Sequence, residues 1–180
     1  MSAHNPDFSE DRIPLAYLIT FRCYGTWLHG DERGSTDRHH NQYGTPFLPR
    51  NERWHKHNQH LLKHPPVELD AARRAAVEAA LRDTCVKRDW LLRAVNVRTN
   101  HAHSVVSAQC WPEPILSAFK ANATRQMREA GCWRYSYSPW ADKGSRRYLW
   151  TPRHIERAID YVLNGQGDEL PDFDDDGEAF

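Results

Sequence analysis

The sequence has no apolar run long enough to cross a lipid bilayer, for which a helix needs roughly 20 residues. Its first twelve residues are polar and acidic, which is not the pattern of a signal peptide. We therefore expect no membrane attachment. The chain also has no CxxC pair, because its four cysteines lie far apart at Cys23, Cys85, Cys110 and Cys132. This spacing favours reduced thiols in a cytoplasm over a zinc knuckle or a disulfide framework.

Lysine and arginine are absent from residues 167–180, which carry seven acidic residues. Without these seven, the 24 acidic residues of the chain fall to 17 against 24 basic ones, so the body has a charge of about +7. A basic body beside an acidic tail points to a polyanionic partner, although ordinary protein surfaces also reach this charge. We expect residues 1–12 to form a flexible arm and residues 167–180 a disordered acidic tail.

Residues 13–166 form the expected domain of this 180-residue chain, which has enough apolar and aromatic residues (39% hydrophobic) to bury a core. Apolar residues alternate in the expected strands and recur every three or four residues in the expected helices. The order is a strand at 14–24, a helix at 71–88, a strand at 90–98, a strand within 99–107, a helix at 112–130, a strand at 146–150 and a helix at 151–166. This order predicts an α+β ferredoxin-like plait, an antiparallel sheet with helices on one face, plus a C-terminal helix.

Residues 25–66 lack a sustained period of either kind and are predicted to be a long irregular insertion. Cations alternate there with aromatic rings, a composition typical of a groove for single-stranded nucleic acid. The candidate DNA-binding residues in or beside this segment are Arg22, Trp27, Arg33 and Arg38. Seven histidines in the same stretch leave adventitious metal binding open, and a solvated loop held by a few aromatics is the simpler alternative.

Two further cations, Lys120 and Arg125, lie off the apolar stripe of the helix at 112–130. They are candidates for contacts with a nucleic-acid backbone, although such residues usually only solvate a helix.

His101 and His103 flank one alanine in a valine-rich strand, so both side chains point to the same face, roughly 7 Å apart along the strand. That spacing allows two imidazoles to bind one metal ion. By spacing alone, two polar residues on the wet face of a strand are the favoured interpretation.

Tyr161 lies about 60° beyond the apolar arc of the last helix, counting 100° per residue, where its hydroxyl could be partly exposed. Taken alone it is a boundary tyrosine that reaches solvent. Beside a two-histidine metal site it could be a nucleophile. Asn164 and Gln166 follow it closely and offer oxygen atoms for a third metal ligand.

The segment TNHAHSVV resembles the His-hydrophobic-His signature of HUH single-strand endonucleases. A single tyrosine in DYVLNGQ resembles the insertion-sequence-type transposases, and YLITFRCYGTWLHGDERGSTDR is similar to the amino-terminal block of relatives of the REP-associated tyrosine transposases. The resemblance covers residues 15–166. It implies a bacterial, cytoplasmic, nucleoid-associated transposase acting on single-stranded or hairpin DNA.

For the matching residues the resemblance implies that His101 and His103 bind Mg²⁺ or Mn²⁺ and that Tyr161 forms a 5′-phosphotyrosine. Better-known members carry Gln or Asn four residues after the tyrosine, where this chain has Gly165. Gln166 is then the first choice for the third ligand, and Asn164 is the alternative. Thr99 replaces the proline that often precedes Asn-His in the signature, and we expect little effect from it.

The tail segment PDFDDDGEAF resembles the acidic tip of bacterial single-stranded-DNA-binding protein. It could occupy the protein's own DNA groove or dock to replication and repair proteins; a disordered solubilising tail is the alternative. Other readings of the whole chain also stay open: a domesticated DNA-binding protein that no longer cleaves, and a metal hydrolase that uses water. The sequence does not distinguish a monomer from a homodimer.

Overall fold

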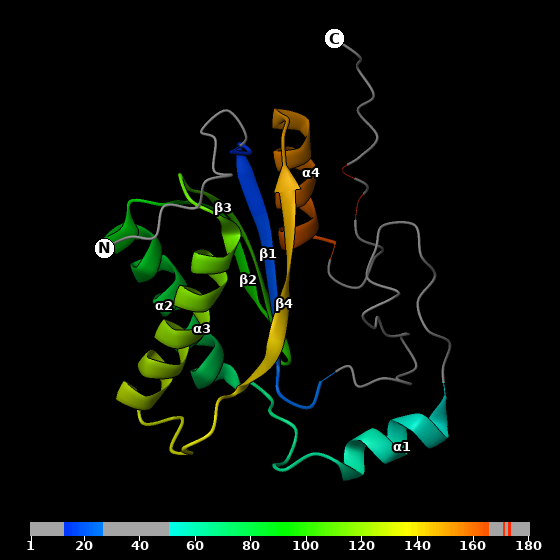
Figure 1. Ribbon diagram of the computed structural model, residues 1–180. Coiled ribbons are helices and arrows are strands. Elements are labelled where there is room, and N and C mark those ends of the chain that lie inside the picture. The colour runs from blue at the N-terminus through cyan, green and yellow to red at the C-terminus, as the bar shows by residue number, and fades with distance from the viewer. Residues whose placement is uncertain (1–12, 27–50, 166–170, 172, 174–180) are drawn as a thin grey trace, which may run out of the picture.

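The computed structural model describes residues 13–26, 51–165, 171 and 173 (Figure 1). Its helices and strands are, in chain order, β1 (Ala16–Cys23), α1 (Glu52–His60), α2 (Ala71–Arg88), β2 (Leu91–Val97), β3 (His101–Ser107), α3 (Pro112–Glu129), β4 (Trp140–Leu149) and α4 (Pro152–Leu163). Within these ranges, no helix is both long enough and apolar enough to span a membrane.

The four strands form one sheet in the order β2-β3-β1-β4, and every neighbouring pair is antiparallel. Helices α2 and α3 pack together on one face of this sheet, and α4 covers the other face (Figure 1). Without α1 and α4, the order of elements is βαββαβ. This is the ferredoxin-like plait with a C-terminal helix that the sequence predicted.

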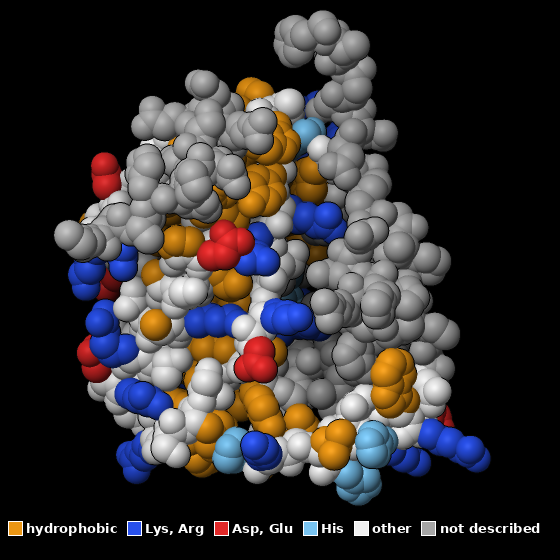
Figure 2. Space-filling view, viewed as in Figure 1, with side chains coloured by type: hydrophobic (Ala, Val, Ile, Leu, Met, Phe, Trp, Pro, Cys, Tyr) orange, Lys and Arg blue, Asp and Glu red, His pale blue; other side chains and the backbone are white. Residues whose placement is uncertain are grey.

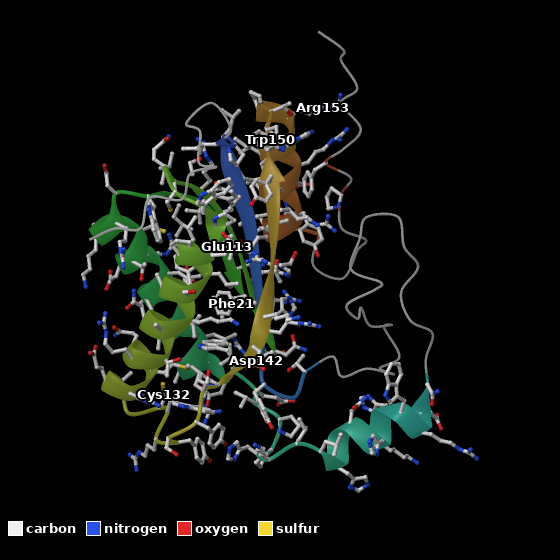
Figure 3. All side chains as sticks on the ribbon, in the orientation of Figure 1. Phe21, Glu113, Cys132, Asp142, Trp150 and Arg153 are labelled. Atoms are coloured by element: carbon white, nitrogen blue, oxygen red, sulfur yellow. The ribbon has the colours of Figure 1, made fainter. Side chains whose placement is uncertain are left out.

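The alternation along β1 divides the core into two parts. Tyr17, Ile19 and Phe21 are fully buried toward α2 and α3, whereas Leu18 packs in the cluster beneath α4. The ring of Phe21, which Figure 3 labels, is nearly perpendicular to that of Trp140, with a centroid separation of 4.9 Å. Because successive side chains of a strand point to opposite faces, Thr20 and the other even-numbered residues of β1 face α4.

The helices of the main layer begin and pack as predicted. The side chain of Asp70 accepts a hydrogen bond from the backbone N–H of Arg73 at 2.9 Å and caps α2. On α3 the predicted stripe is completely buried at Ile115, Phe119, Ala123 and Met127. Spacing of four residues places these side chains on one side of the helix, facing the sheet.

Part of the predicted irregular insertion is helical, which corrects the prediction for residues 52–60. Asn51 caps α1 by accepting a hydrogen bond from the backbone N–H of Trp54 at 3.1 Å. None of the nine residues of α1 is buried, and α1 stands apart from the three layers (Figure 1). A helix with no buried face shows no apolar periodicity, so the pattern could not reveal it. Residues 27–50 lie outside the described residues.

Strand β4 begins at Trp140, not at Arg146 as predicted. Its first half begins with the buried Trp140, continues through the exposed Asp142 and Lys143, and pairs with β1 at Trp140 and Gly144. The Lys120 ammonium group donates hydrogen bonds to the carbonyls of Ala141, Asp142 and Lys143 at 2.6, 3.2 and 3.0 Å. These bonds attach the early part of β4 to α3, a tertiary contact that alternation in the sequence does not report.

One residue of the predicted acidic tail is part of the core. Phe173 is only 7% exposed and packs in the cluster beneath α4, with its ring 5.9 Å from that of His154. We predicted an unanchored segment because it has too few apolar residues to fold alone. A single phenylalanine needs no core of its own, since it can enter one that the domain already has. The acidic residues around it, like residues 1–12, lie outside the described residues.

Candidate functional site

The structure brings three predicted site residues together from two elements that are distant in the sequence. His101 and His103 lie on the α4 face of β3, and their ring centroids are 4.5 Å apart at an interplanar angle of 75°. The ring of His103 lies edge-on to that of Tyr161 on α4, with centroids 5.5 Å apart. Packing of Val105, Ala158 and Val162 in the shared cluster fixes α4 across this strand.

Both imidazoles are oriented through the same ring atom. His101 Nδ1 lies 2.6 Å from the side-chain oxygen of Asn100, and His103 Nδ1 lies 2.6 Å from the hydroxyl oxygen of Thr20. An amide oxygen can only accept, so His101 Nδ1 carries the proton and Nε2 holds the lone pair. A metal-binding histidine is usually fixed in this way, with the second nitrogen held by an oxygen atom.

His103 is a neutral imidazole at physiological pH. Burial, together with the electrostatic effect of the nearby His101 and Arg98, lowers its pKa from 6.5 to about 3. His103 is only 5% exposed. The neutral form is the one that binds a metal ion, because protonation would occupy the lone pair.

Two imidazoles supply only part of a coordination shell. Within the described ranges, no group of three or more His, Cys, Asp or Glu side chains could hold a metal ion. A third ligand from the described residues would therefore have to be an oxygen atom of an amide, a hydroxyl or the backbone. Asn164 is exposed at the end of α4. Its Nδ2 donates a hydrogen bond to Asp160 at 2.7 Å, so Oδ1 is the side-chain atom that could bind a metal ion. Gln166 lies outside the described residues.

Arginines border the histidine pair on both neighbouring strands. Arg22 of β1 is the register partner of His101 and belongs to the face that carries the two histidines. On the other side the backbone N–H of Arg98 donates to the carbonyl of His101 at 2.8 Å. Arg22 was predicted as a DNA-binding residue, whereas Arg98 was missed. The sequence signal that could have identified Arg98 is its position at the end of the predicted hairpin, directly across from His101.

The other predicted DNA-binding residues do not gather at this site. Lys120 lies in the α2–α3 layer, on the opposite side of the sheet, and burial lowers its pKa. Its ammonium group donates to three carbonyls of β4, and its proposed contact with a phosphate stays a prediction. Trp27, Arg33 and Arg38 lie outside the described residues.

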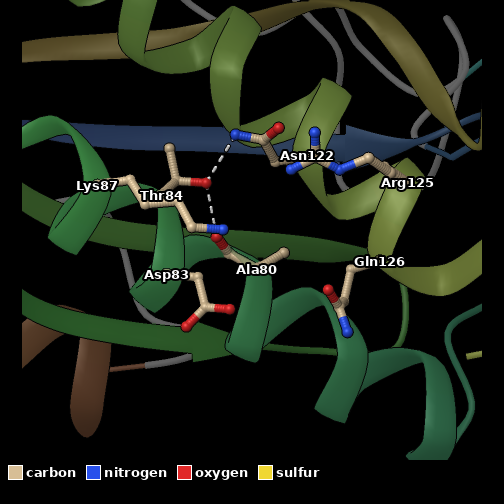
Figure 4. Close-up of a pocket in the computed structure, with 7 residues that line it drawn as sticks. All are labelled: Ala80, Asp83, Thr84, Lys87, Asn122, Arg125 and Gln126. Atoms are coloured by element: carbon tan, nitrogen blue, oxygen red, sulfur yellow. Dashed lines mark hydrogen bonds between the residues drawn. The ribbon is translucent and has the colours of Figure 1, made fainter. Parts of the chain in front are cut away.

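Arg125 also lies in the α2–α3 layer, in a shallow hollow between the two helices (Figure 4). The amide of Asn122 donates there to the hydroxyl of Thr84, which in turn donates to the carbonyl of Ala80. Arg125 itself pairs with Glu129 at 3.8 Å. The bond from Asn122 to Thr84 connects α3 to α2, whereas the other two contacts each lie within one helix, and the sheet separates Arg125 from Tyr161.

Gly165 packs directly against the candidate nucleophile. A Cβ atom at this position would lie 3.1 Å from both Cα and Cδ2 of Tyr161 and 3.3 Å from its carbonyl oxygen. The backbone N–H of Gly165 donates to that same carbonyl at 3.0 Å. The absence of a side chain at position 165 therefore allows the chain to turn closely against Tyr161 as α4 ends.

No protein family and no curated protein matches the sequence. Among solved structures, one that resembles the chain is described as that of a REP-associated tyrosine transposase bound to a REP hairpin. The likeness is distant. The TM-score is 0.44 at 10% sequence identity, over 82% of this chain and 63% of that chain. This chain thus spans less than two thirds of the compared structure, and a similarity this low carries no argument about the chemistry of the site.

Proposed function

We propose that this protein is a metal-dependent single-strand DNA endonuclease and strand transferase in which Tyr161 is the nucleophile. The observation that supports the proposal is the grouping of His101, His103 and Tyr161 on one face, with both imidazoles oriented through Nδ1. A tyrosine at the edge of a helix explains neither the oxygen atoms of Thr20 and Asn100 beside the imidazoles nor the neutral, buried state of His103. Both features are typical of histidines that bind a metal ion.

The roles of the residues follow from their positions. His101 and His103 would hold Mg²⁺ or Mn²⁺, which supplies polarisation of the phosphoryl group and neutralises the charge that develops on it. Asn100 and Thr20 keep the two rings in place. Arg22 and Arg98 provide positive charge for the phosphates on either side of His101.

Tyr161 would attack the phosphorus atom through its hydroxyl oxygen, which loses its proton. A bond from Tyr161 to phosphorus forms while the bond from phosphorus to the 3′ oxygen breaks, and the proton is delivered to that oxygen. The products are a 5′-phosphotyrosine and a free 3′-hydroxyl. One phosphate ester replaces another, so a second 3′-hydroxyl can reverse the step without ATP.

Incubation with labelled single-stranded DNA that contains hairpins, in the presence of Mn²⁺, tests the proposal by denaturing electrophoresis. We expect a covalent protein–DNA adduct with the wild-type protein and none with Tyr161→Phe, which lacks only the hydroxyl. Retention of the adduct in Tyr161→Phe, or no adduct on any hairpin substrate, would contradict the proposal. Hairpin binding that ignores both Tyr161→Phe and a chelator would instead indicate a protein that binds without cleaving. Turnover without an adduct would indicate hydrolysis by water.

Gly165→Ala is expected to slow adduct formation by roughly tenfold, because the added methyl group must displace the ring of Tyr161 by a few tenths of an ångström and catalysis is sensitive to such misplacement. Hairpin affinity should stay the same, since the change is confined to the nucleophile. Single-turnover rates at saturating DNA measure the effect. Val86→Ala is the control, since Val86 is 81% exposed on α2, on the opposite side of the sheet. Equal rates for both variants would show that Gly165 does not position Tyr161.

A further inference from the structure

A hollow of about 430 Å³ lies along the end of α1 and the segment that follows it. Its lining combines apolar rings with groups that form hydrogen bonds: Gln59, Leu62, Lys63, His64, Pro65 and Pro66. This volume is in the range of pockets that hold small ligands. The proposed chemistry at Tyr161 makes no use of it.

The imidazole that lines the hollow is the first ring of an aromatic stack. His64 and Tyr137 lie parallel, with centroids 3.8 Å apart and an interplanar angle of 3°. Tyr135 continues the stack at 5.1 Å and 30°, and it is 52% exposed. A stack of flat rings beside an open space is the arrangement on which a planar base can lie.

The wall of the hollow is held in place by the end of β1. The backbone N–H of Lys63 donates to the hydroxyl of Tyr24 at 3.0 Å, and that of Val67 donates to the carbonyl of Tyr24 at 2.9 Å. Gly25 adopts a positive φ of 75°, and a Cβ there would lie 2.8 Å from Cα of Pro66. A preformed wall lowers the ordering cost of binding a ligand.

The charge around the hollow suits a phosphate. Lys63 is an exposed cation in its lining, and α1 adds Arg53 and Lys56 against the one acid of that helix, Glu52. Figure 2 shows cationic, histidine and apolar side chains close together along this lower end of the molecule. Flat rings with nearby cations are the combination that binds single strands without reading their sequence.

We propose that this hollow binds one unpaired nucleotide of the DNA substrate, with its base on His64 and its phosphate near Lys63. The inference rests on the proposed function for the identity of the ligand. Tyr24 follows Arg22 by two residues, roughly 7 Å along the strand, and Arg22 is the register partner of His101. The hollow and the histidine pair thus lie at the same end of the sheet, so one DNA strand can pass from one to the other.

The test measures binding of a fluorescein-labelled dT oligonucleotide by anisotropy, without added metal, to the full chain carrying Tyr161→Phe. In this background, His64→Ala is expected to weaken affinity about tenfold, as loss of one stacked base would. His64→Phe keeps a flat ring and should retain affinity. Lys63→Gln should lower the slope of log affinity against log salt by about 0.7, the value for one phosphate of a single strand.

His57→Ala is the matched control, because His57 is an exposed histidine of α1 outside the hollow. An oligonucleotide in which every position is abasic separates base from backbone: His64→Ala should not affect its binding, whereas Lys63→Gln should. Unchanged dT affinity in His64→Ala, or an equal loss on the abasic strand, would overturn the inference and leave the cleavage proposal intact. Conversely, the expected binding results with no covalent adduct would support the nucleotide site while contradicting the nuclease. Failure of the background protein to bind dT at all would contradict the nucleotide site, whereas the adduct assay on hairpin DNA tests the nuclease separately.

Discussion

His103→Ala is expected to reduce covalent cleavage of hairpin DNA by about a thousandfold, or roughly 4 kcal/mol of activation free energy. The substitution removes the more deeply buried of the two imidazoles and leaves His101 as a single ligand from this strand. One imidazole retains a divalent ion far less well than two that are already oriented. Mn²⁺ binding, measured directly from the signal of free Mn²⁺, should fall together with activity.

Thr20→Val provides an intermediate case for the same site. Its methyl group replaces the hydroxyl that lies 2.6 Å from His103 Nδ1, so the ring stays but loses its orienting oxygen. We expect Mn²⁺ affinity to fall about 10- to 100-fold, the usual effect of removing such a partner. His57→Ala serves as a histidine control outside the site. If His103→Ala kept wild-type Mn²⁺ affinity, the two histidines would not be metal ligands.

Gly144→Ala is expected to lower the free energy of unfolding by about 1–3 kcal/mol, the usual cost of forcing a methyl group into a packed interior. A Cβ at this position would lie 2.7 Å from the backbone oxygen of Thr20 and 2.8 Å from Cδ1 of Leu116. The leucine can rotate, but the carbonyl cannot move without shifting β1. Because Thr20 also contacts His103, the same shift should disturb the candidate site.

Thermal unfolding measures this effect, at about 2–4 °C per kcal/mol for a chain of this size. Ser145→Ala, at the next position of β4 and exposed, is the control and should stay within about 0.5 kcal/mol of wild type. The direction of the change in melting temperature tests whether the added methyl group clashes. Where no clash occurs, replacing glycine with alanine stabilises a protein by about 0.4–1 kcal/mol through the unfolded chain. A higher melting temperature in Gly144→Ala would therefore show that the close approach of β1 does not exclude a methyl group at this position.

Local signals in the sequence predicted the elements that bury apolar residues. Period-two alternation located β1, and spacing of four with an Asp70 cap located α2. The same signals failed where burial does not govern the structure. Helix α1 buries none of its residues, and the early part of β4 after the buried Trp140 is held by backbone pairing and by Lys120. Neither arrangement leaves an apolar pattern in the sequence.

For the candidate site, the sequence alone determined that His101 and His103 share a face, because alternation along a strand requires it. It also determined that Tyr161 lies at the edge of the last apolar arc. Only the tertiary structure decided that α4 crosses β3 at this point, and that Thr20 and Asn100 orient the two rings. Equally, only the structure separated Lys120 and Arg125 from the site by placing α3 on the other face. The reason is physical: periodicity reports which side of its own element a residue occupies, whereas contacts between elements depend on how the whole core packs.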